Sequence, residues 1–350
     1  MTNNNKDKSA CVLFVGGGSL GHVIPSLAVL EALKKIEPNI QTHFVCSNTK
    51  LEIDFLSKNK ISFTGTTPPR IGISFIWKIP KALKEADNIL NKIQPDIIFS
   101  KGGYASIPIC ISTKRRGIPI ILHESDAIFG RANKWLIKYA TKVCISFSNM
   151  KLKKNIKEKT IVTGNPVRES ILNGSKEKAL KITGFNNNKP ILLILGGSQG
   201  AKTLNEAIIR NINTLLERFN IIHITGRGKK IIDNKSGYFS CEFAFNDLAH
   251  FYAATDLAIS RAGGNATAEL LACGIPTILV PLRGVGHDHQ QKNAQLLEEN
   301  GQCNVLQQFG IDEKLTAKID ATIHREYKNQ KSSNLASSKI AKIILEVLAS

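Results

Sequence analysis

Residues 11–36 read CVLFVGGGSLGHVIPSLAVLEALKKI: a short apolar run, a glycine-rich turn, and a segment whose apolar residues recur at helical spacing. This pattern predicts a buried strand followed at once by a helix. Residues 190–208, PILLILGGSQGAKTLNEAI, repeat it in the second half of the chain. Other apolar runs, such as PDIIFS at residues 95–100 and CEFAF at residues 241–245, are typical of parallel strands covered by helices on both faces. The sequence therefore predicts an α/β fold with two doubly wound parallel-sheet domains.

The length of 350 residues suits two domains, each with its own core. Polar, turn-rich segments separate the two sets of apolar runs and place the junction near residues 164–168. We expect four parts: a flexible tail over residues 1–9, an N-terminal domain over residues 10–165, a C-terminal domain over residues 166–332, and a terminal helix over residues 333–350 that could pack back on the N-terminal domain.

The chain carries 47 basic and 28 acidic residues, a net charge of +19. This excess favours anionic partners such as phosphates, acidic lipid surfaces or nucleic acids. No stretch approaches the roughly 20 apolar residues of a membrane-spanning helix, and the N-terminus lacks the apolar core of a secretory signal. We therefore expect a cytoplasmic protein whose seven widely spaced cysteines stay reduced.

Gly16, Gly18 and Gly21 form a GxGxxG pattern between the first strand and the first helix, where bare backbone can approach a diphosphate. The second strand ends in CSN at residues 46–48, without the acid that binds the ribose of a dinucleotide, so ordinary NAD binding is disfavoured. His22 follows the glycines. It could take a proton from a sugar hydroxyl as a neutral imidazole, or it could hydrogen-bond the loop or a phosphate, and its position alone favours neither role.

The second half offers polar groups at the ends of its predicted strands. Ser198 lies in a glycine turn that opens a helix, where it can cap the helix or donate to a phosphate. Arg168, at the junction, could bind a phosphate or form an interdomain salt bridge. Glu269 could accept hydrogen bonds from two ribose hydroxyls or complement its helix dipole. Gln290 and Gln291 carry amides that suit sugar hydroxyls, although surface glutamines are usually inert.

The sequence argues against a metal site. It contains no Asp-x-Asp pattern, which binds manganese in one large class of nucleotide-sugar transferases. His287, Asp288 and His289 are adjacent, so on a helix their side chains point apart and do not suit one shared ion. We expect no metal and no cofactor.

Seven segments, in order, resemble the MurG family, the UDP-N-acetylglucosamine:undecaprenyl-pyrophosphoryl-muramoyl-pentapeptide N-acetylglucosaminyltransferases of peptidoglycan synthesis. They are GGSLGHVIPSLAV, SKGGYASIP, HESDAIFGRANKWL, TGNPVRESI, LGGSQGAKTLNEAI, SRAGGNATAELLACGIPTILVP and DHQQKNA, and the similarity runs from about Val12 to about Gln302. The resemblance implies a GT-B fold, in which two Rossmann-like domains face each other across a cleft. It also implies inverting, metal-independent transfer of N-acetylglucosamine from UDP to the C4 hydroxyl of the muramoyl sugar of lipid I, giving lipid II and UDP.

The same resemblance implies two sets of substrate-binding residues. The donor set would hold UDP-N-acetylglucosamine through Arg168 and Ser198 at the phosphates, the backbone of Phe245 at uracil, the segment Gly264, Asn265, Ala266, Thr267, Ala268 and Glu269 at the ribose, and Gln290 and Gln291 at the sugar hydroxyls. The second set would line the donor and acceptor cleft with Ser19, Leu20 and Gly21, with Asp126 near the donor sugar and His22 as the candidate base.

The sequence departs from the family pattern at two places in the predicted N-terminal domain. It reads GGSLGH where the family usually has GGTGGH, so Leu20 adds bulk where backbone should approach a diphosphate. It reads HESD where the family usually has HEQN, so Asp126 adds negative charge near an anionic substrate.

A lipid acceptor requires the protein to reach a membrane surface without spanning it. Residues 71–86, IGISFIWKIPKALKEA, place Phe75, Ile76, Trp77 and Ile79 beside Lys78 and Lys81. This mixture could enter an anionic leaflet, or the segment could be an ordinary buried helix. We expect a peripheral location on the cytoplasmic face of the cell membrane.

Two other functions stay open. A related UDP-sugar transferase could act on another lipid acceptor such as diacylglycerol, which these motifs separate poorly. A basic nucleotide-binding or nucleic-acid-binding protein without transferase activity would fit the charge, but the chain has no recognisable nucleic-acid module and only 6% aromatic residues. We therefore expect no nucleic-acid partner.

Overall fold

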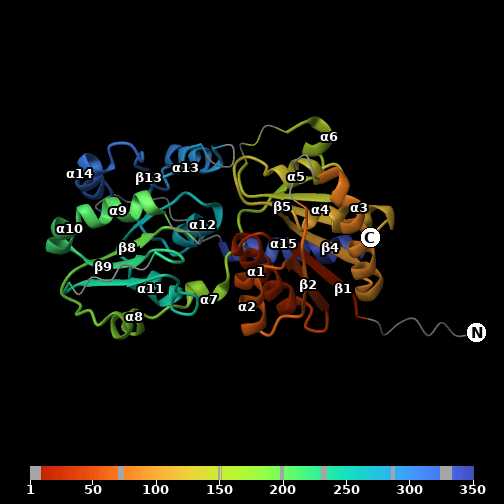
Figure 1. Cartoon of the computed structure of the whole chain (residues 1–350), viewed down its shortest axis with the longest axis horizontal. Coiled ribbons are helices and arrows are strands. Elements are labelled where there is room, and N and C mark those ends of the chain that lie inside the picture. The colour runs from red at the N-terminus through yellow and green to blue at the C-terminus, as the bar shows by residue number, and fades with distance from the viewer. Residues whose placement is uncertain are drawn as a thin grey trace, which may run out of the picture. The chain divides into compact units, whose positions relative to one another are not determined.

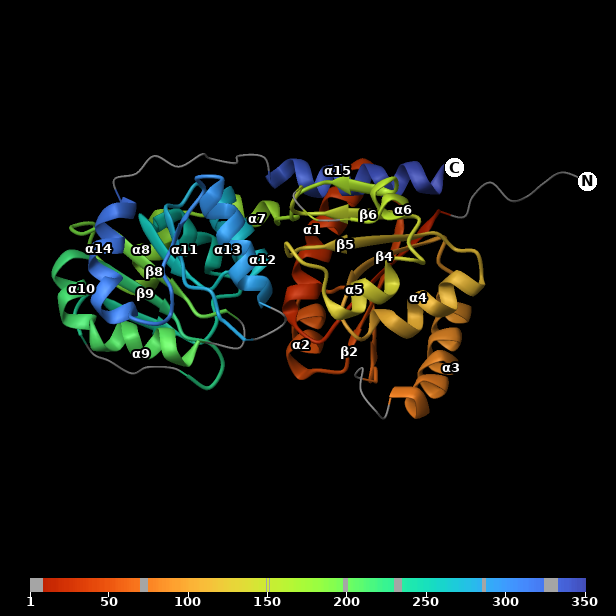
Figure 2. The ribbon, with the colours of Figure 1, turned by 90° about the horizontal axis from the view of Figure 1, so that it is seen from above.

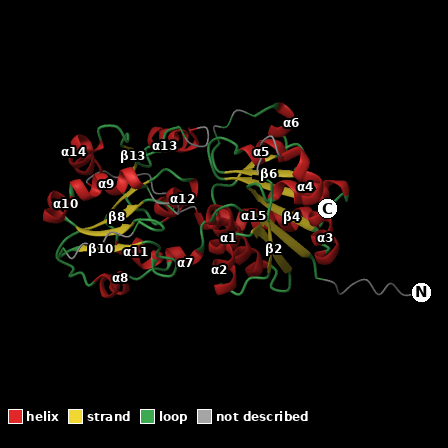
Figure 3. Cartoon of the chain, in the orientation of Figure 1, coloured by secondary structure: helices red, strands yellow, loops and turns green. Residues whose placement is uncertain are grey.

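The structure, a computed structural model, describes residues 9–69, 75–148, 150, 152–197, 201–229, 235–284, 288–323 and 333–350. The chain forms two compact units (Figure 1). Unit 1 comprises Met1–Pro166 and Leu335–Ser350, and unit 2 comprises Val167–Asn334. In each unit, strands are flanked by helices (Figure 3).

Unit 1 alternates strands and helices along the chain. Its strands are β1 (Cys11–Gly16), β2 (Gln41–Ser47), β3 (Phe63–Thr66), β4 (Ile97–Gly102), β5 (Ile120–Glu124), β6 (Lys142–Ile145) and β7 (Thr160–Val162). Its helices are α1 (Leu20–Ile36), α2 (Lys50–Lys58), α3 (Phe75–Ile93), α4 (Ser106–Arg115), α5 (Arg131–Leu136), α6 (Lys154–Lys157) and almost all of α15 (Ser333–Leu348).

The strands of unit 1 form one sheet in the order β3-β2-β1-β4-β5-β6-β7. All neighbouring strands within the described residues pair in parallel. The chain builds one half of the sheet outward from β1 and the other half outward from β4, so the strand order reverses between these two strands. Ligands of doubly wound sheets bind beyond the carboxyl ends of the strands at such a reversal. The loops after β1 and β4 therefore lie where a ligand is expected.

Alternate residues of β1 face opposite sides of the sheet. Val12 and Phe14 pack in a core with α1, α2 and α15, whereas Leu13 and Val15 pack in a core with α3, α4 and α5. Figure 2 shows α15 on the side of the strands opposite α3 and α4. Ile344 of α15 is fully buried in this core, and burying such a side chain contributes about 1.5–3 kcal/mol. The last helix of the chain thus completes the core of the first unit.

Unit 2 repeats the alternation. Its strands are β8 (Ile191–Leu195), β9 (Asn220–Ile224), β10 (Tyr238–Cys241), β11 (Leu257–Ser260), β12 (Thr277–Leu279) and β13 (Asn304–Val305). Its helices are α7 (Glu169–Leu172), α8 (Lys176–Thr183), α9 (Lys202–Arg210), α10 (Ile212–Arg218), α11 (Leu248–Ala254), α12 (Gly264–Ala272), α13 (His289–Glu299) and α14 (Ile311–Ile323).

The sheet of unit 2 has the order β10-β9-β8-β11-β12-β13, and its described strand pairs are all parallel. Leu192 and Ile194 of β8 pack against α9, α10 and α14 on one face, while Leu193 and Leu195 pack against α7, α8, α11 and α12 on the other. The order reverses between β8 and β11, so the loops after these strands mark the ligand side of unit 2. The predicted fold class, α/β with two doubly wound parallel sheets, is confirmed.

One predicted strand is displaced along the chain. The apolar run at residues 241–245 predicts a strand there, but β10 spans Tyr238–Cys241 and most of the run lies beyond it. Tyr238 is buried, and its hydroxyl lies 2.9 Å from Nδ1 of His223 on the neighbouring strand β9. Phe243 and Phe245 instead stack on each other, with ring centroids 5.2 Å apart. The run is apolar because of this ring pair and not because it forms a strand.

Candidate functional site

His22 lies in the first turn of α1, directly after the glycine-rich loop that follows β1. Its Nδ1 is 3.2 Å from the carbonyl oxygen of Lys101 on β4. Because a carbonyl oxygen only accepts, we assign the proton to Nδ1, and Nε2 keeps its lone pair. Burial and then the charge of Lys101 lower the pKa of His22 to about 4, against a smaller opposing effect of Asp126. At neutral pH His22 is thus an uncharged imidazole whose Nε2 can accept a proton.

Lys101 is a buried cation beside His22, with only 3% of its surface exposed. Its ammonium donates to Nδ1 of His123 at 2.8 Å and to the hydroxyl of Ser125. Nε2 of His123 donates to the carbonyl of Gly164 at 3.1 Å, which leaves Nδ1 as the acceptor for the ammonium. The side chain of Lys101 therefore ties the end of β4 to the end of β5.

Burial lowers the pKa of Lys101 to about 8, against the opposing carboxylates of Glu124 and Asp126. Most Lys101 side chains are therefore still charged at neutral pH. The sequence predicts no role for this lysine. The available signal was its place directly before two glycines in SKGGYASIP, at the end of a predicted strand. It is nevertheless a central polar residue of this part of unit 1.

Glu124 shapes the turn that carries Asp126. One carboxylate oxygen accepts the amide of Asp126 at 3.1 Å, and the other accepts the amide of Gly130 at 2.9 Å and Nδ2 of Asn133 at 2.8 Å. Burial raises the pKa of Glu124, and the negative charge of Asp126 raises it further. Asp126 is half-buried and lies close enough to influence both His22 and Lys101.

The sequence places no acid at the end of β2, but the structure brings one there from α2. The carboxylate of Glu52, which is fully buried, accepts the amide of Gly18 at 2.8 Å and the amide of Ser47 at 2.9 Å. The Gly18 amide, which the sequence analysis offered to a diphosphate, is thus already hydrogen-bonded. The loops after β1 and β4 also touch, because a Cβ on Gly103 would lie 2.2 Å from the carbonyl oxygen of Gly17. Glu52 and these glycines fix the loop that precedes His22.

The structure places Leu20 differently from the sequence analysis. Its side chain is 3% exposed and packs in the core with Phe14, so its bulk faces inward and away from solvent. Ser19 and Gly21, on either side, are half-buried, and the carbonyl of Ser19 accepts the amide of His22 at 3.0 Å. The departure at Leu20 therefore adds core packing to α1 and does not put bulk toward a ligand.

In unit 2, a buried carboxylate links three elements. Oε2 of Glu269 on α12 accepts the hydroxyl of Tyr252 from α11 at 3.1 Å, and Oε1 lies 4.0 Å from Nη2 of Arg168 at the start of α7. Glu269 is 7% exposed. Burial raises its pKa, while the charge of Arg168 and the Tyr252 hydroxyl lower it. Arg168 and Glu269, named from separate motifs, are thus neighbours, and Tyr252 is a third member that no motif indicated.

Three residues of the predicted donor set carry buried polar atoms that have no hydrogen-bond partner within the described ranges: Arg168 Nε, Thr267 Oγ1 and Gln291 Oε1. An unsatisfied buried polar atom costs about 1–3 kcal/mol, and most such atoms in proteins are satisfied. Asn293 donates to the carbonyl of Ala262 at 3.1 Å, which ties α13 to the loop before α12. A donor, a hydroxyl and an amide oxygen suit the phosphates and hydroxyls of a polar ligand.

The other predicted donor residues lie on loops and helix starts of unit 2. Phe245 is 39% exposed and stacks on Phe243. Oε1 of Gln290 accepts the amide of Leu282 at 3.1 Å, so this side chain is partly committed to the protein itself. Four residues form the half-buried part of the first two turns of α12: Gly264, Asn265, Ala266 and Ala268. Ser198 lies outside the described residues.

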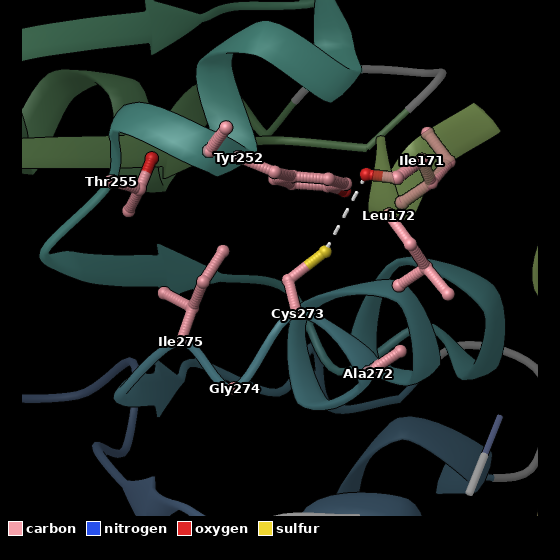
Figure 4. A pocket seen from close by; sticks show the side chains of 9 residues that line it. Ile171, Leu172, Tyr252, Thr255, Ala272, Cys273, Gly274 and Ile275 are labelled. Carbon is pink, nitrogen blue, oxygen red and sulfur yellow. Dashed lines mark hydrogen bonds between the residues drawn. The ribbon is translucent and has the colours of Figure 1, made fainter. Parts of the chain in front are cut away.

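A cavity of about 430 Å³ lies beside Tyr252 (Figure 4). Its lining includes Ile171, Leu172, Tyr252 and Cys273, and the Cys273 thiol lies 3.8 Å from the carbonyl oxygen of Ile171. Burial raises the pKa of Cys273 to about 12, so the thiol stays protonated. None of the predicted substrate-binding residues lines this cavity. The cavity is therefore distinct from the substrate site that the sequence predicts.

Across the described residues, no three His, Cys, Asp or Glu side chains gather in a way that could hold a metal ion.

Two domain models of one family match the chain. Residues 12–145 match the glycosyltransferase family 28 N-terminal domain, and residues 191–347 match the glycosyltransferase family 28 C-terminal domain. Two relatives carry the name UDP-N-acetylglucosamine–N-acetylmuramyl-(pentapeptide) pyrophosphoryl-undecaprenol N-acetylglucosamine transferase. The protein from Clostridium tetani is 38% identical over 87% of each chain, and that from Lachnoclostridium phytofermentans is 36% identical over 92% of each chain.

Solved structures share the fold at lower identity. MurG of Acinetobacter baumannii has a TM-score of 0.69 at 23% identity, covering 98% of this chain and 99% of its own. UDP-GlcNAc 2-epimerase from Neisseria meningitidis, bound to UDP-GlcNAc, has a TM-score of 0.67 at 15% identity, covering 96% of this chain and 100% of its own. These likenesses concern the arrangement of the backbone, which transferases and epimerases share.

Proposed function

Since the chain belongs to glycosyltransferase family 28 and, within it, to the UDP-N-acetylglucosamine–N-acetylmuramyl-(pentapeptide) pyrophosphoryl-undecaprenol N-acetylglucosamine transferases, we propose that it transfers N-acetylglucosamine from UDP-N-acetylglucosamine to the C4 hydroxyl of the muramoyl sugar of lipid I. The products are lipid II and UDP. The observation that carries the proposal is the set of unsatisfied buried polar atoms on Arg168, Thr267 and Gln291 in unit 2.

The donor is held by unit 2. Tyr252 fixes Oε2 of Glu269, so the carboxylate is already oriented to accept hydrogen bonds from neighbouring ribose hydroxyls. Arg168 Nε, which is buried and unsatisfied within the described structure, donates to a phosphate oxygen. Thr267 and Gln291 supply a hydroxyl and an amide to the remaining polar groups of the nucleotide sugar. A preorganised donor set of this kind can stabilise developing charge on the leaving diphosphate by several kcal/mol.

The chemical step is a single displacement with inversion. The acceptor oxygen forms a bond to the anomeric carbon while the bond from that carbon to the UDP oxygen breaks, and the electron pair leaves with UDP. Nε2 of His22 takes the proton of the acceptor hydroxyl, because its tautomer leaves this lone pair free. Arg168 and Ser198 receive the negative charge that forms on the diphosphate.

The reaction is tested with purified protein, lipid I and UDP-N-acetylglucosamine. We expect lipid II, with a β-linked N-acetylglucosamine and one UDP released per transfer. Parallel reactions offer diacylglycerol as acceptor and UDP-glucose as donor. Sugar on diacylglycerol and none on lipid I would contradict the proposed acceptor and favour the related lipid glycosyltransferase.

A patch on unit 1 supports a peripheral membrane location on the cytoplasmic face. Ile76 and Trp77 of α3 are 73% and 84% exposed, and Trp135 of α5 is 46% exposed; we call these three residues the apolar patch. Phe75 is instead buried, and its ring meets that of Trp135 edge-on at 5.6 Å, so α3 and α5 are in contact. Exposed basic residues occur on both helices and in the turn just after α5: Lys78, Lys81, Lys84, Arg131, Lys134 and Lys138.

Among the helices that the structure describes, none has the length and apolar character needed to cross a bilayer. Large exposed aromatic side chains surrounded by lysine and arginine are suited to the interface of an anionic leaflet, where the rings enter the headgroup region and the cations meet lipid phosphates. Within the described part of residues 71–86, Phe75 belongs to the core, and the exposure of Ile76 and Trp77 supports their role as the proposed membrane contact.

A further inference from the structure

Lys101 links several segments of unit 1 through both its side chain and its backbone. Its ammonium donates to His123 and Ser125 on the β5 side, and its carbonyl oxygen accepts Nδ1–H of His22 on α1. The hydroxyl of Ser125 passes the contact on to Oδ1 of Asn165 at 3.0 Å. One residue therefore sets the position of three segments that meet at the reversal of strand order.

Two carboxylates, those of Glu124 and Asp126, act on the positive charge of Lys101. A buried ammonium is costly unless opposite charge lies nearby. Glu124 is nearby and also accepts three hydrogen bonds, from the amides of Asp126 and Gly130 and from the side chain of Asn133 on α5. The carboxylate of Glu124 favours the charged form of Lys101 most, and that of Asp126 comes next; Asp126 is half-buried and directly follows Ser125, which accepts a hydrogen bond from the ammonium. Asp126 is also one of the two positions at which the chain departs from the usual family pattern.

We infer that Lys101 is a positioning residue for the acceptor side, which holds His22 and the segment 123–126 in place and whose positive charge offsets the negative charge of Asp126. Lys101 then cancels the extra negative charge that Asp126 brings where the family usually has a neutral amide, so an anionic acceptor is not repelled. The inference rests on the proposed transfer reaction, because the acceptor diphosphate is the anion that an unbalanced carboxylate would repel.

The test is a double-mutant cycle on the full-length enzyme: wild type, Lys101→Met, Asp126→Asn and the double variant. Methionine is unbranched and uncharged, so Lys101→Met removes the charge at similar length. We expect Lys101→Met to lower kcat/KM for lipid I at least about tenfold, in keeping with the coupling of close charge pairs, with KM for UDP-N-acetylglucosamine unchanged. Adding Asp126→Asn should recover most of that loss. Lys58→Met, an exposed lysine of α2, is the matched control.

Two outcomes overturn the inference. Either Lys101→Met keeps full kcat/KM for lipid I, or the double variant is no better than Lys101→Met, as expected if Lys101 only supports the fold. Tryptophan fluorescence, which comes from Trp77 and Trp135 in unit 1, reports whether that unit is folded in each variant. A wild-type enzyme that makes no lipid II would count against the proposed function itself, so the two failures are separable.

A second measurement does not require any change at Lys101. The titratable groups that face its ammonium are His22 on α1, His123 and Glu124 on β5, Asp126 beyond β5, and Cys144 on β6. Activity that needs charged Lys101 is lost as pH rises through its pKa. Asp126→Asn removes an attraction that raises this pKa, so the alkaline limb of the pH–rate profile should move to lower pH.

Asp54→Asn, an exposed carboxylate of α2, is the control for that measurement and should leave the limb in place. An alkaline limb that is identical in wild type and Asp126→Asn would overturn the charge pairing even if Lys101→Met failed to fold.

Discussion

The hydroxyl of Tyr252 donates to Oε2 of Glu269 at 3.1 Å, inside unit 2 and away from solvent. This bond leaves Oε1 directed toward Arg168, 4.0 Å away. A carboxylate that must receive two ribose hydroxyls loses rotational freedom when it binds them, and Tyr252 has already removed part of that freedom. Tyr252 is therefore expected to act on nucleotide affinity through Glu269.

Tyr252→Phe should weaken UDP binding about five- to tenfold, because it removes a hydrogen bond to a charged group worth about 1–1.5 kcal/mol. Calorimetry of UDP binding measures the change. Tyr238→Phe is the matched control, since it deletes another buried hydroxyl of unit 2, the one at 2.9 Å from His223. Equal losses of affinity in the two variants would mean that Tyr252 acts through stability alone.

His22→Asn should lower kcat by about 10²- to 10⁴-fold, the usual contribution of a positioned general base. Asparagine can still donate to the Lys101 carbonyl but has no basic atom, and the Kd for UDP should stay constant. In wild type the base form is lost as pH falls through the pKa of His22, which is about 4. The acid limb of kcat/KM should therefore lie near pH 4, well below the ordinary 6.5. Full turnover in His22→Asn would remove His22 from this role.

His223 should make unit 2 sensitive to acid. It is fully buried between Asn205 and Tyr238, and burial lowers its pKa from 6.5 to about 4. Below pH 6.5 the His223 side chain binds a proton in the unfolded chain but stays neutral in the folded chain. The free energy of unfolding therefore falls as the pH drops toward 4, by at most about 1.4 kcal/mol per pH unit. Hydrogen exchange of the β9 amides measures this loss. His223→Gln should flatten the dependence, and an unchanged slope would assign it to other groups.

The apolar patch should govern adsorption to membranes. Replacing Ile76 and Trp77 together by serine should weaken binding to vesicles containing anionic lipid by at least about tenfold, because the exposed indole and isoleucine provide the apolar area that enters the interface. Flotation at two salt concentrations measures it. Phe309→Ser, which removes an apolar side chain of unit 2 that is 94% exposed, is the control and should bind as wild type. Salt-independent binding would contradict the part assigned to the surrounding lysines.

Ile344→Ala should destabilise unit 1 by about 2–5 kcal/mol, since it opens a cavity in a core where the side chain has no exposed surface. The chain has two tryptophans, Trp77 and Trp135, and both lie in unit 1, so tryptophan fluorescence in urea reports the unfolding of that unit. Lys342→Ala, on the exposed face of α15, should change stability by less than about 0.5 kcal/mol. A similar midpoint for both variants would show that α15 is only loosely held.

The fold could be predicted from the sequence, because apolar runs, glycine turns and helical spacing are local patterns within about 25 residues. Contacts between distant segments could not be predicted in this way. Glu52 reaches back 34 residues to the amide of Gly18, and no spacing rule marks α2 as the source of that acid. Likewise, the family pattern placed the bulk of Leu20 toward a diphosphate, whereas its side chain packs in the core; both positions are compatible with the first turn of a helix.

The candidate site shows the same division. Residues in short motifs, such as Arg168 and Glu269, could be named and do lie together. The residues that support Glu269 and His22 are Tyr252 and Lys101, respectively. They come from an ordinary helix and from an apolar strand, and only the packed structure shows that they are buried beside these partners. The position of β10 was also predicted wrongly, because Phe243 and Phe245, which stack on each other outside the sheet, make residues 241–245 look like a strand.

Unit 2 is one continuous stretch of the chain, whereas unit 1 consists of two pieces that enclose it in sequence. During synthesis on the ribosome, unit 2 can therefore finish folding as it emerges, while unit 1 waits with one face of its sheet lacking α15. A chain that ends before α15 would therefore contain all the strands of both units but lack the helix that completes the core of unit 1. The order of translation and the order of completion are thus reversed in this molecule.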